Sequence, residues 1–306
     1  MISIPAYAKV NLALEVVARR ADGFHDLSTV FVIIDWHDLV SLELSVGIDH
    51  GVDRRPGSIE VTGPTAAAAM GEPDALVARA AVAVAGLASA ALRRPARLDV
   101  RVVKRIPVLA GLGGGSADAA AVLRGGAAEV ARRFPGTRLP REALADAGAA
   151  LGSDVPALLA GGTSLAAGRG EELLAVPGAP RLHLAVAIAG ASSTAAAYAA
   201  LTGAERRADG RSARVAAALR EGRHPHGADL GSALEGAASR ANPSLAAELT
   251  RLRSGTGLPW SLTGSGGAAF HLASGGAGAA AAVAAAVALG MEARSCRTLP
   301  LGFSPP

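Results

Sequence analysis

A cluster of glycines between an apolar segment and an alanine-rich segment constrains this chain more than any other feature. Residues 111–115 read Gly-Leu-Gly-Gly-Gly. The β-prone residues 97–105 precede the cluster and the helix-prone residues 118–133 follow it, so the pattern predicts a strand, a glycine loop and a helix N-terminus. Glycine lets the backbone turn its N–H groups inward, and a helix start adds free N–H donors and a partial positive charge. The segment therefore predicts a binding site for a polyanion such as a triphosphate.

The order of residues in this loop excludes the commonest glycine-rich motifs. A dinucleotide-binding G-x-G-x-x-G motif that starts at Gly111 would need glycine where Ser116 stands. A Walker A loop needs a lysine that is missing here, and the protein-kinase loop does not run from a strand into a helix. A plain packing loop stays open as an alternative, because 38 of the 306 residues are glycine.

Length and patterning predict a two-domain α+β protein. A chain of 306 residues exceeds one typical hydrophobic core. Gly161 and Gly162 indicate a boundary or a tight turn, so we expect one domain over residues 1–162, with the glycine loop, and a second domain over residues 163–306. Strands and helices alternate without the strict repeat of a parallel sheet, which favours an α+β fold.

Composition argues against nucleic-acid, membrane and secreted classes. The net charge is +4 and aromatic residues make up 3% of the chain, so a basic stacking surface for nucleic acid is not expected. We find no window of about 18 strongly apolar residues and expect no membrane span. Cys296 is the single cysteine, and no signal peptide is apparent at the start, so we expect a cytoplasmic protein.

The two lysines are candidates for specific roles. The chain has 30 basic residues, yet only Lys9 and Lys104 are lysines. An ammonium group is a compact point charge, whereas a guanidinium is a wide planar fork. A chain that uses arginine elsewhere can keep lysine where the fork does not fit, although survival by chance is an equal alternative.

A coarse assignment of elements places these residues. Alternating residues 3–17 predict a strand with Lys9 and Asn11 on one face. Further strands are expected at 27–34, 38–46, 59–62, 97–105, 181–188 and 291–298, with a hairpin near 263–267. Helices are expected at 75–92, 118–133, 140–151, 194–202, 243–252 and 277–289, with a solvated arginine-rich stretch at 205–224.

Six segments, in this order, resemble the GHMP kinases over nearly the full chain. They are residues 8–12 (Ala-Lys-Val-Asn-Leu), 20–25 (Arg-Ala-Asp-Gly-Phe-His), 106–118 with the glycine loop, 151–156 (Leu-Gly-Ser-Asp-Val-Pro), 168–171 (Gly-Arg-Gly-Glu) and 262–267 (Leu-Thr-Gly-Ser-Gly-Gly). The resemblance implies a ribosomal-S5-like N-terminal domain and a ferredoxin-like C-terminal domain. Residues 20–25 resemble the branch that phosphorylates the 2-hydroxyl of 4-diphosphocytidyl-2-C-methyl-D-erythritol with ATP, in the non-mevalonate route to isoprenoid precursors.

The resemblance also implies roles for individual residues. Asp154 is the expected base, with Lys9 beside it and Asn11 orienting the substrate. From the residues alone, Asp154 after Gly-Ser reads more readily as a helix cap. The expected ATP-binding residues are Lys104, Pro107, Val108, Leu109, Ala110, Gly111, Leu112, Gly113, Gly114, Gly115, Ser116 and Ala117. Mg²⁺ is expected to arrive on ATP, without a dedicated protein metal site.

The cytidine end of the substrate is assigned by the same resemblance. Phe24 and Tyr198 are expected to stack on cytosine, and His25 to read its polar edge. The alternatives to ligand binding are structural: Phe24 packs in the hydrophobic core, and Tyr198 packs its helix against the rest of the protein. Residues Thr263, Gly264, Ser265 and Gly266 are expected to close over phosphates and substrate. The chain departs from the family pattern at Ala75, Ala117, Phe24, Ser232 and Ala233.

Rival functions remain at this point. Another small-molecule GHMP kinase would have no use for a cytidine-stacking pair. A non-catalytic nucleotide sensor would not need both Lys9 and Asp154, and an S5-like nucleic-acid module would need basic clusters. We therefore expect an ATP-dependent kinase of a small molecule, acting as a monomer or homodimer without nucleic acid or membrane.

Overall fold

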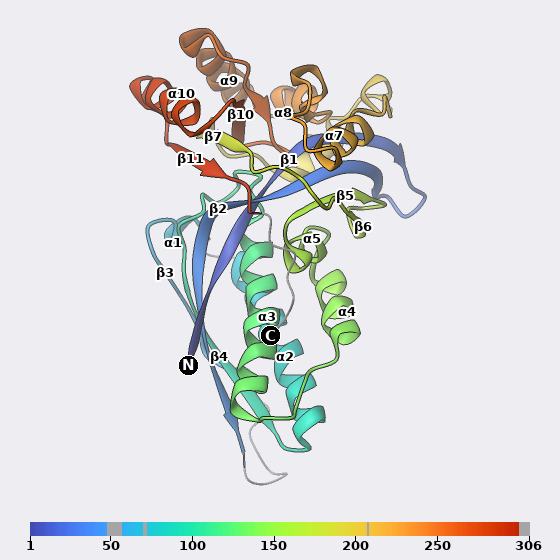
Figure 1. The fold of residues 1–306 in the computed structure, drawn as a ribbon, viewed down its shortest axis with the longest axis vertical. Coiled ribbons are helices and arrows are strands. Elements are labelled where there is room, and N and C mark those ends of the chain that lie inside the picture. The colour runs from blue at the N-terminus through green and yellow to red at the C-terminus, as the bar shows by residue number, and fades with distance from the viewer. Residues whose placement is uncertain (48–56, 70–71, 207, 300–306) are drawn as a thin grey trace.

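Two β-sheets, each flanked by helices, make up the protein (Figure 1). The computed structural model describes residues 1–47, 57–69, 72–206 and 208–299. The first sheet has seven strands, in the order β3-β4-β2-β1-β8, with β5 pairing to β2 and to β6. Its strands are β1 (Ile2–Arg19), β2 (His25–Val46), β3 (Ile59–Thr62), β4 (Ala96–Val103), β5 (Thr163–Ala167), β6 (Glu172–Ala175) and β8 (Gly231–Ser232).

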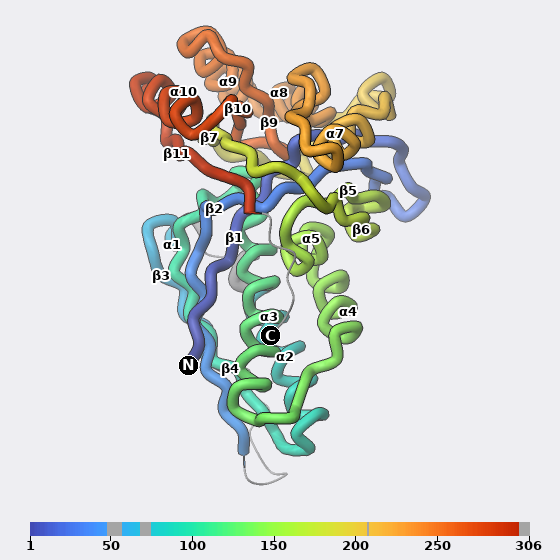
Figure 2. The backbone as a smooth tube through the Cα atoms, viewed as in Figure 1, coloured from blue at the N-terminus to red at the C-terminus, as the bar shows by residue number. Residues whose placement is uncertain are grey.

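Strands β1 and β2 form a long antiparallel pair that contacts elements of both halves of the molecule. Figure 2 shows it running from the N-terminus towards the C-terminal helices, where both strands contact α7 (Arg211–Arg220). We expected two strands, 27–34 and 38–46, but β2 is continuous over 22 residues. The predicted break is a bulge instead: the partner of Tyr7 is His37, whereas the partner of Lys9 is Ile33. A bulge bends a strand without ending its pairing.

Helices cover one face of this sheet. They are α1 (Ala66–Ala69), α2 (Glu72–Leu92), α3 (Gly114–Arg133), α4 (Arg141–Leu151) and α5 (Val155–Ala160). The central helix, α3, packs on β1, β2 and α2. Two of its glycines permit this close packing, because a Cβ on Gly125 or Gly126 would lie 2.4 Å from a side-chain carbon of Leu42 or Val84. The main hydrophobic core lies between these helices and the sheet.

The hydropathy expectation is wrong for α2. Its segment Ala75–Leu92 has a mean hydropathy of 1.9 over 18 residues and is long and apolar enough to cross a membrane by those two measures. Here α2 packs against α3 and β4, and its buried residues Val77, Ala80, Val84 and Ala88 recur at helical spacing. A single such helix is weak evidence for a span, because core helices of globular proteins pass the same test.

The second sheet is antiparallel, with four strands in the order β11-β7-β10-β9. Its strands are β7 (His183–Ile188), β9 (Ser261–Leu262), β10 (Ala268–Ala273) and β11 (Ala293–Arg297), and its helices include α9 (Pro243–Thr256) and α10 (Gly276–Ala288). The remaining C-terminal helices are α6 (Thr194–Ala199), α7 and α8 (Glu235–Ala241), with 3-10 turns η1 (Gly203–Glu205) and η2 (Gly227–Asp229). Helices between β7 and β9 and between β10 and β11 give the ferredoxin-like order of elements, so the predicted α+β class is confirmed.

The assignment of strands to the two sheets does not follow the predicted division at residue 162. Strands β5 and β6 follow that residue, yet they extend the first sheet, and β8 pairs in parallel with β1. The chain therefore first enters the second sheet after β6, and it returns once to the first sheet at β8. This exchange of strands ties the two halves together beside β1.

The predicted solvated stretch at 205–224 is wrong over α7. The helix buries Val215 and Leu219, while Arg214 and Arg220 face solvent. Its start is held by the carboxylate of Glu15 on β1, which is 2% exposed. This carboxylate accepts the backbone N–H groups of Gly210 at 2.8 Å and Ser212 at 2.9 Å. A buried acceptor far away in the sequence thus stabilises a helix that arginine content alone does not predict.

Candidate active site

A cavity of about 1240 Å³ lies along β1 where the two halves meet. Its wall is formed by β1, β2, the glycine loop, the start of α5, α6 and the loop before β10. This volume exceeds the range of about 300–1,000 Å³ that is usual for a pocket with one small ligand. The cavity is therefore large enough for two ligands side by side.

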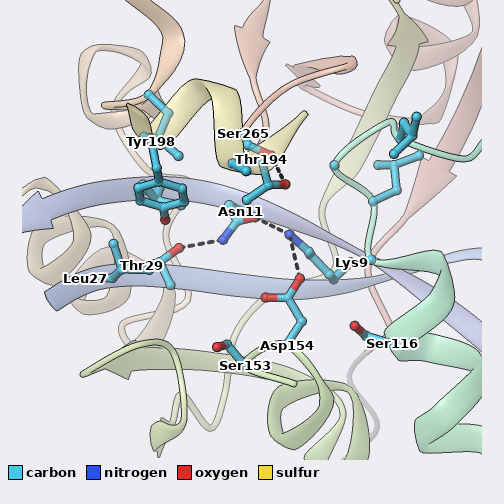
Figure 3. Close-up of a pocket in the computed structure, with 18 of the residues that line it drawn as sticks. Lys9, Asn11, Leu27, Thr29, Ser116, Ser153, Asp154, Thr194, Tyr198 and Ser265 are labelled. Atoms are coloured by element: carbon cyan, nitrogen blue, oxygen red, sulfur yellow. Dashed lines mark hydrogen bonds and ion pairs between the residues drawn. The ribbon is translucent and has the colours of Figure 1, made fainter. Parts of the chain in front are cut away.

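A lysine, an aspartate and an asparagine meet at the centre of this cavity (Figure 3). The Nζ atom of Lys9 lies 3.3 Å from Oδ2 of Asp154 and donates to Oδ1 of Asn11 at 2.6 Å. Asn11 donates in turn to the hydroxyl of Thr29 at 2.8 Å, and Thr29 donates to the carbonyl of Ala13 at 2.7 Å. This chain fixes the lysine ammonium, which has little freedom because Lys9 is 4% exposed.

The side chain of Asp154 does not cap a helix. Asp154 is the N-cap residue of α5, but its side chain makes no capping hydrogen bond. It faces Lys9 across the cavity instead, and it is 33% exposed there. The cap interpretation of the sequence is therefore wrong, and the carboxylate is left accessible to a ligand.

The glycine loop forms the wall beside Lys9. Gly111 and Gly113 have φ angles of 72° and 71°, a region that glycine enters without strain. A Cβ on Gly113 would lie 3.0 Å from Cγ of Lys9, so a side chain at this position would displace the lysine. α3 begins at Gly114 rather than at the predicted residue 118, because Gly113 takes the left-handed conformation and caps it. The unpaired N–H groups of the first turn thus lie at the cavity wall.

A second glycine-rich loop, residues 263–267, packs directly against the first glycine loop, residues 111–115. A Cβ on Gly111 would lie 2.8 Å from the carbonyl oxygens of both Gly266 and Thr263. The hydroxyl of Thr263 accepts the backbone N–H of Asn11 at 2.8 Å. These contacts connect the C-terminal half directly to the strand that carries Lys9.

Three aromatic side chains, Phe24, His25 and Tyr198, line the end of the cavity that lies away from the glycine loop. The rings of His25 and Tyr198 are stacked, with centroids 5.0 Å apart at 26°. Phe24 is 52% exposed, and the guanidinium of Arg169 lies 4.8 Å above its ring. Burial lowers the pKa of His25, and the positive charge of arginines nearby lowers it further, so the imidazole is neutral near pH 7. A core role for Phe24 is excluded by its exposure.

Most of the residues predicted for the site do line the cavity. They are Lys9, Asn11, Phe24, His25, Lys104, Pro107, Val108, Leu109, Ala110, Gly111, Leu112, Gly113, Gly114, Gly115, Ser116, Asp154, Tyr198, Gly264 and Ser265. Ala117, Thr263 and Gly266 do not line it. The ammonium of Lys104 is held by two buried carboxylates, Asp38 and Asp118.

Sequence reasoning missed several residues of the wall. Among them are Arg19, Thr29, Leu76, Arg169, Thr194 and Arg206. Arg169 lies in a motif that resembles the family and could have been found there. The hydroxyl of Thr194 lies 2.8 Å from that of Ser265, a contact between distant segments that leaves no local signal in the sequence.

The cavity wall offers little to a bare metal ion. Within residues 1–47, 57–69, 72–206 and 208–299, no three His, Cys, Asp or Glu side chains form a group suited to a metal. In the same part of the chain, Asp154 is the single carboxylate on the cavity wall. Magnesium that binds here would take most of its ligands from phosphate oxygens and water.

Comparisons with known proteins identify the family to which the chain belongs. The model of the GHMP kinases N terminal domain matches residues 75–162. A 4-diphosphocytidyl-2-C-methyl-D-erythritol kinase of Salinispora tropica is 40% identical over 281 residues, which cover 88% of this chain and 82% of the relative. The enzyme of the same name from Salinispora arenicola is 39% identical over 303 residues, covering 95% and 90%.

Solved structures agree with the sequence relatives. A crystal structure of 4-(cytidine 5'-diphospho)-2C-methyl-D-erythritol kinase has a TM-score of 0.74 and 31% identity, and the match covers 99% of this chain and 100% of that one. Homoserine kinase from Cytophaga hutchinsonii, at 17% identity and a TM-score of 0.59, shares the fold. With these relatives, the chain belongs to the GHMP kinases and, among them, to the family of 4-diphosphocytidyl-2-C-methyl-D-erythritol kinases.

Proposed function

We propose that this protein transfers the γ-phosphoryl group of ATP to the 2-hydroxyl of 4-diphosphocytidyl-2-C-methyl-D-erythritol. The reaction belongs to the non-mevalonate route to isoprenoid precursors. The observation that carries the proposal is the pairing of Lys9 with an uncapped, accessible Asp154 directly beside the glycine loop. The names of the relatives support the choice of substrate.

The proposed reaction needs a base and a fixed positive charge. Asp154 accepts the proton of the 2-hydroxyl while that oxygen bonds to the γ-phosphorus, and the bond from phosphorus to the β,γ-bridging oxygen breaks to leave ADP. Lys9 orients the carboxylate of Asp154 and stabilises negative charge on the attacking oxygen. Asn11 holds the ammonium in place through its 2.6 Å hydrogen bond.

ATP is proposed to lie along the glycine loop. Backbone N–H groups at Gly114, Gly115 and Ser116, at the start of α3, face this wall and suit phosphate oxygens. Mg²⁺ bound to ATP would neutralise phosphate charge, and Asp154 and Ser116 are two side chains of the wall that could offer it an oxygen ligand. The apolar wall at Leu76 and Pro107 suits the adenine ring.

The aromatic end is proposed to hold the cytosine. Phe24 and Tyr198 offer ring faces, and the neutral imidazole of His25 offers one donor and one acceptor to the base edge. Gly264 and Ser265 line the cavity between this end and Lys9. We further propose a cytoplasmic monomer or homodimer without a nucleic-acid or membrane partner, which sedimentation and cell fractionation test.

The experiment that tests the function is ADP release with a panel of acceptors. Purified protein with ATP and Mg²⁺ should form ADP with 4-diphosphocytidyl-2-C-methyl-D-erythritol and not with mevalonate or homoserine. Release of ADP with mevalonate or homoserine alone would assign the chain to another GHMP activity. Nucleotide binding without ADP release from any acceptor would favour a sensor.

A further inference from the structure

A lysine and two aspartates are buried directly behind the glycine loop. Lys104 follows β4, Asp38 lies in β2 and Asp118 lies in α3. Their side chains are 2%, 0% and 1% exposed. Buried charges are rare unless they are paired and hydrogen-bonded, because removing a charge from water costs free energy. The presence of this cluster therefore calls for an explanation.

The cluster holds both ends of the loop. Lys104 Nζ donates to Oδ2 of Asp38 and, at 2.6 Å, to Oδ2 of Asp118. The other oxygen of Asp38 accepts the backbone N–H groups of Arg105 and Ile106, the latter at 2.7 Å. Ile106 opens the loop and Asp118 lies in the helix that follows it. One ammonium therefore connects the entry and the exit of the phosphate-binding segment.

The ammonium also supports the first residue of the helix. A Cβ on Gly114 would lie 3.4 Å from Lys104 Nζ and 3.2 Å from Cγ2 of Ile106. Lys104 Nζ thus lies close to the first residue of α3. A larger residue at position 114 would crowd both Lys104 and Ile106.

The charges of the cluster do not balance without a proton. Two carboxylates and one ammonium leave a net negative charge in a site that is almost fully buried, which is unfavourable. Burial raises the pKa of Asp118 to about 8, the charge of Lys104 opposes this, and the charge of Asp38 adds to it. Burial lowers the pKa of Lys104, but the two carboxylates outweigh it and the net shift is upward.

We propose that Lys104, Asp38 and Asp118 form a loop brace, a set of positioning residues that fixes the glycine loop for ATP and keeps one proton between its two carboxyl groups at neutral pH. Lys104, although it lines the cavity, then acts through the loop, which differs from the direct nucleotide contact that the family resemblance implies. The inference rests on the proposed function only in taking ATP as the ligand of the loop.

Nucleotide binding without acceptor substrate tests the brace. The probe is the non-hydrolysable analogue AMPPNP with Mg²⁺, measured by calorimetry. Asp118→Leu, which removes every polar contact of a residue that does not line the cavity, should weaken binding on the order of tenfold, the lower end of the loss seen when metal ligands lose an orienting partner. Asp118→Asn mimics the protonated acid and should bind within about twofold of the wild type. Asp146→Asn, an exposed carboxylate on α4, is the matched control and should bind like the wild type.

A double variant separates positioning from direct contact. Lys104→Met should weaken AMPPNP binding, and Lys104→Met with Asp118→Leu should be no weaker than the worse single variant, because residues of one network are not additive. If Lys104→Met weakens binding while Asp118→Leu does not, Lys104 contacts the nucleotide directly and the brace is wrong. Asp118→Asn binding as poorly as Asp118→Leu would also overturn it.

The pH dependence of stability tests the shared proton independently. The charged groups that act on Asp118 within the described residues are Lys104 and Asp38. Because folding raises this pKa from about 3.9, the folded state binds more protons, and the stabilisation present below pH 4 is lost as pH rises to about 8. The Tm of the wild type should therefore fall relative to Asp118→Asn between pH 5 and 8 and then run parallel. Parallel curves across the whole range would refute the proton.

These readouts keep the brace distinct from the substrate assignment. AMPPNP binding needs no cytidylated acceptor, so a failure to phosphorylate that acceptor leaves the brace to be judged on its own variants. Should the wild type fail to bind AMPPNP, the ATP site falls, and with it the part of the inference that concerns ATP, while the Tm comparison still decides whether the cluster holds a proton.

Discussion

Lys9 and Asp154 approach to 3.3 Å between Nζ and Oδ2 although they lie on β1 and at the start of α5. The ion pair is the central contact of the cavity, because Asn11 fixes the lysine from one side and the glycine loop crowds it from the other. Asp154 makes no helix cap and is 33% exposed, so its carboxylate is free to accept a proton from a bound hydroxyl.

Replacing Asp154 with asparagine separates a base from a structural residue. We expect Asp154→Asn to lower kcat by about 100- to 10,000-fold, the usual contribution of a positioned base, with AMPPNP binding retained. Because the side chain makes no capping bond, Tm should stay near that of the wild type, whereas loss of a cap costs about 1 kcal/mol. Near-native kcat, or a Tm loss of that size with activity kept, would show that Asp154 serves the helix.

Lys9→Arg tests whether the site needs a compact ammonium. A Cβ built on Gly113 would lie 3.0 Å from Cγ of Lys9, and a Cβ built on Gly264 would lie 3.4 Å from Nζ of Lys9. The wide fork of a guanidinium does not fit between these two loops. We expect turnover to fall at least tenfold, an effect of about 1.4 kcal/mol on the barrier, although the charge is kept. Turnover like that of the wild type would show that charge alone suffices.

Two glycines provide a matched pair for the loop. Gly113 and Gly136 have φ angles of 71° and 92°, so alanine is strained by about 1–2 kcal/mol at either position. A Cβ at Gly136 meets nothing within 4 Å, whereas one at Gly113 meets Lys9. We expect Gly113→Ala and Gly136→Ala to lose similar Tm, but only Gly113→Ala to lose activity. Equal activities, measured as kcat/KM, would mean that the loop tolerates a side chain beside Lys9.

The sequence predicted what depends on local pattern. Alternation over residues 3–17 placed Lys9 and Asn11 on one face of a strand, and β1 carries both with their side chains hydrogen-bonded. The glycine cluster and the segment before it likewise predicted the loop between β4 and α3. These features need only the pleat of a strand and the backbone freedom of glycine.

The sequence did not predict contacts that depend on distant segments. Lys104 pairs with Asp38, 66 positions away, and Glu15 caps α7 through Ser212, 197 positions away. The burial of Val215 and Leu219 in α7 and the pairing of Lys104 with two aspartates were therefore not predicted. Periodicity carries no record of which buried carboxylate meets which cation, because that depends on how the strands and helices pack.

The last prediction concerns the aromatic end of the cavity. Phe24 is 52% exposed, so Phe24→Ala removes little packing and Tm should not change. Stacking of a base on an aromatic ring contributes about 1–3 kcal/mol, so the KM for the cytidylated substrate should rise roughly 5- to 150-fold. The KM for ATP should not change, because the glycine loop lies at the other side of Lys9. Leu174→Ala on β6 removes an equally exposed apolar side chain, 58% exposed, outside the cavity and should leave both KM values unchanged.

His25→Ala extends the same test to the edge of the base. The imidazole stacks on Tyr198 at 5.0 Å and its lowered pKa keeps it neutral near pH 7, so it can donate to one base atom and accept from another. Its loss should reduce the discrimination between cytidine and uridine forms of the substrate, measured as the ratio of their kcat/KM values. If Phe24→Ala and His25→Ala raise the KM for ATP instead, the two ends of the cavity are assigned in reverse, and the cytidylated substrate is assigned to the wrong place with them.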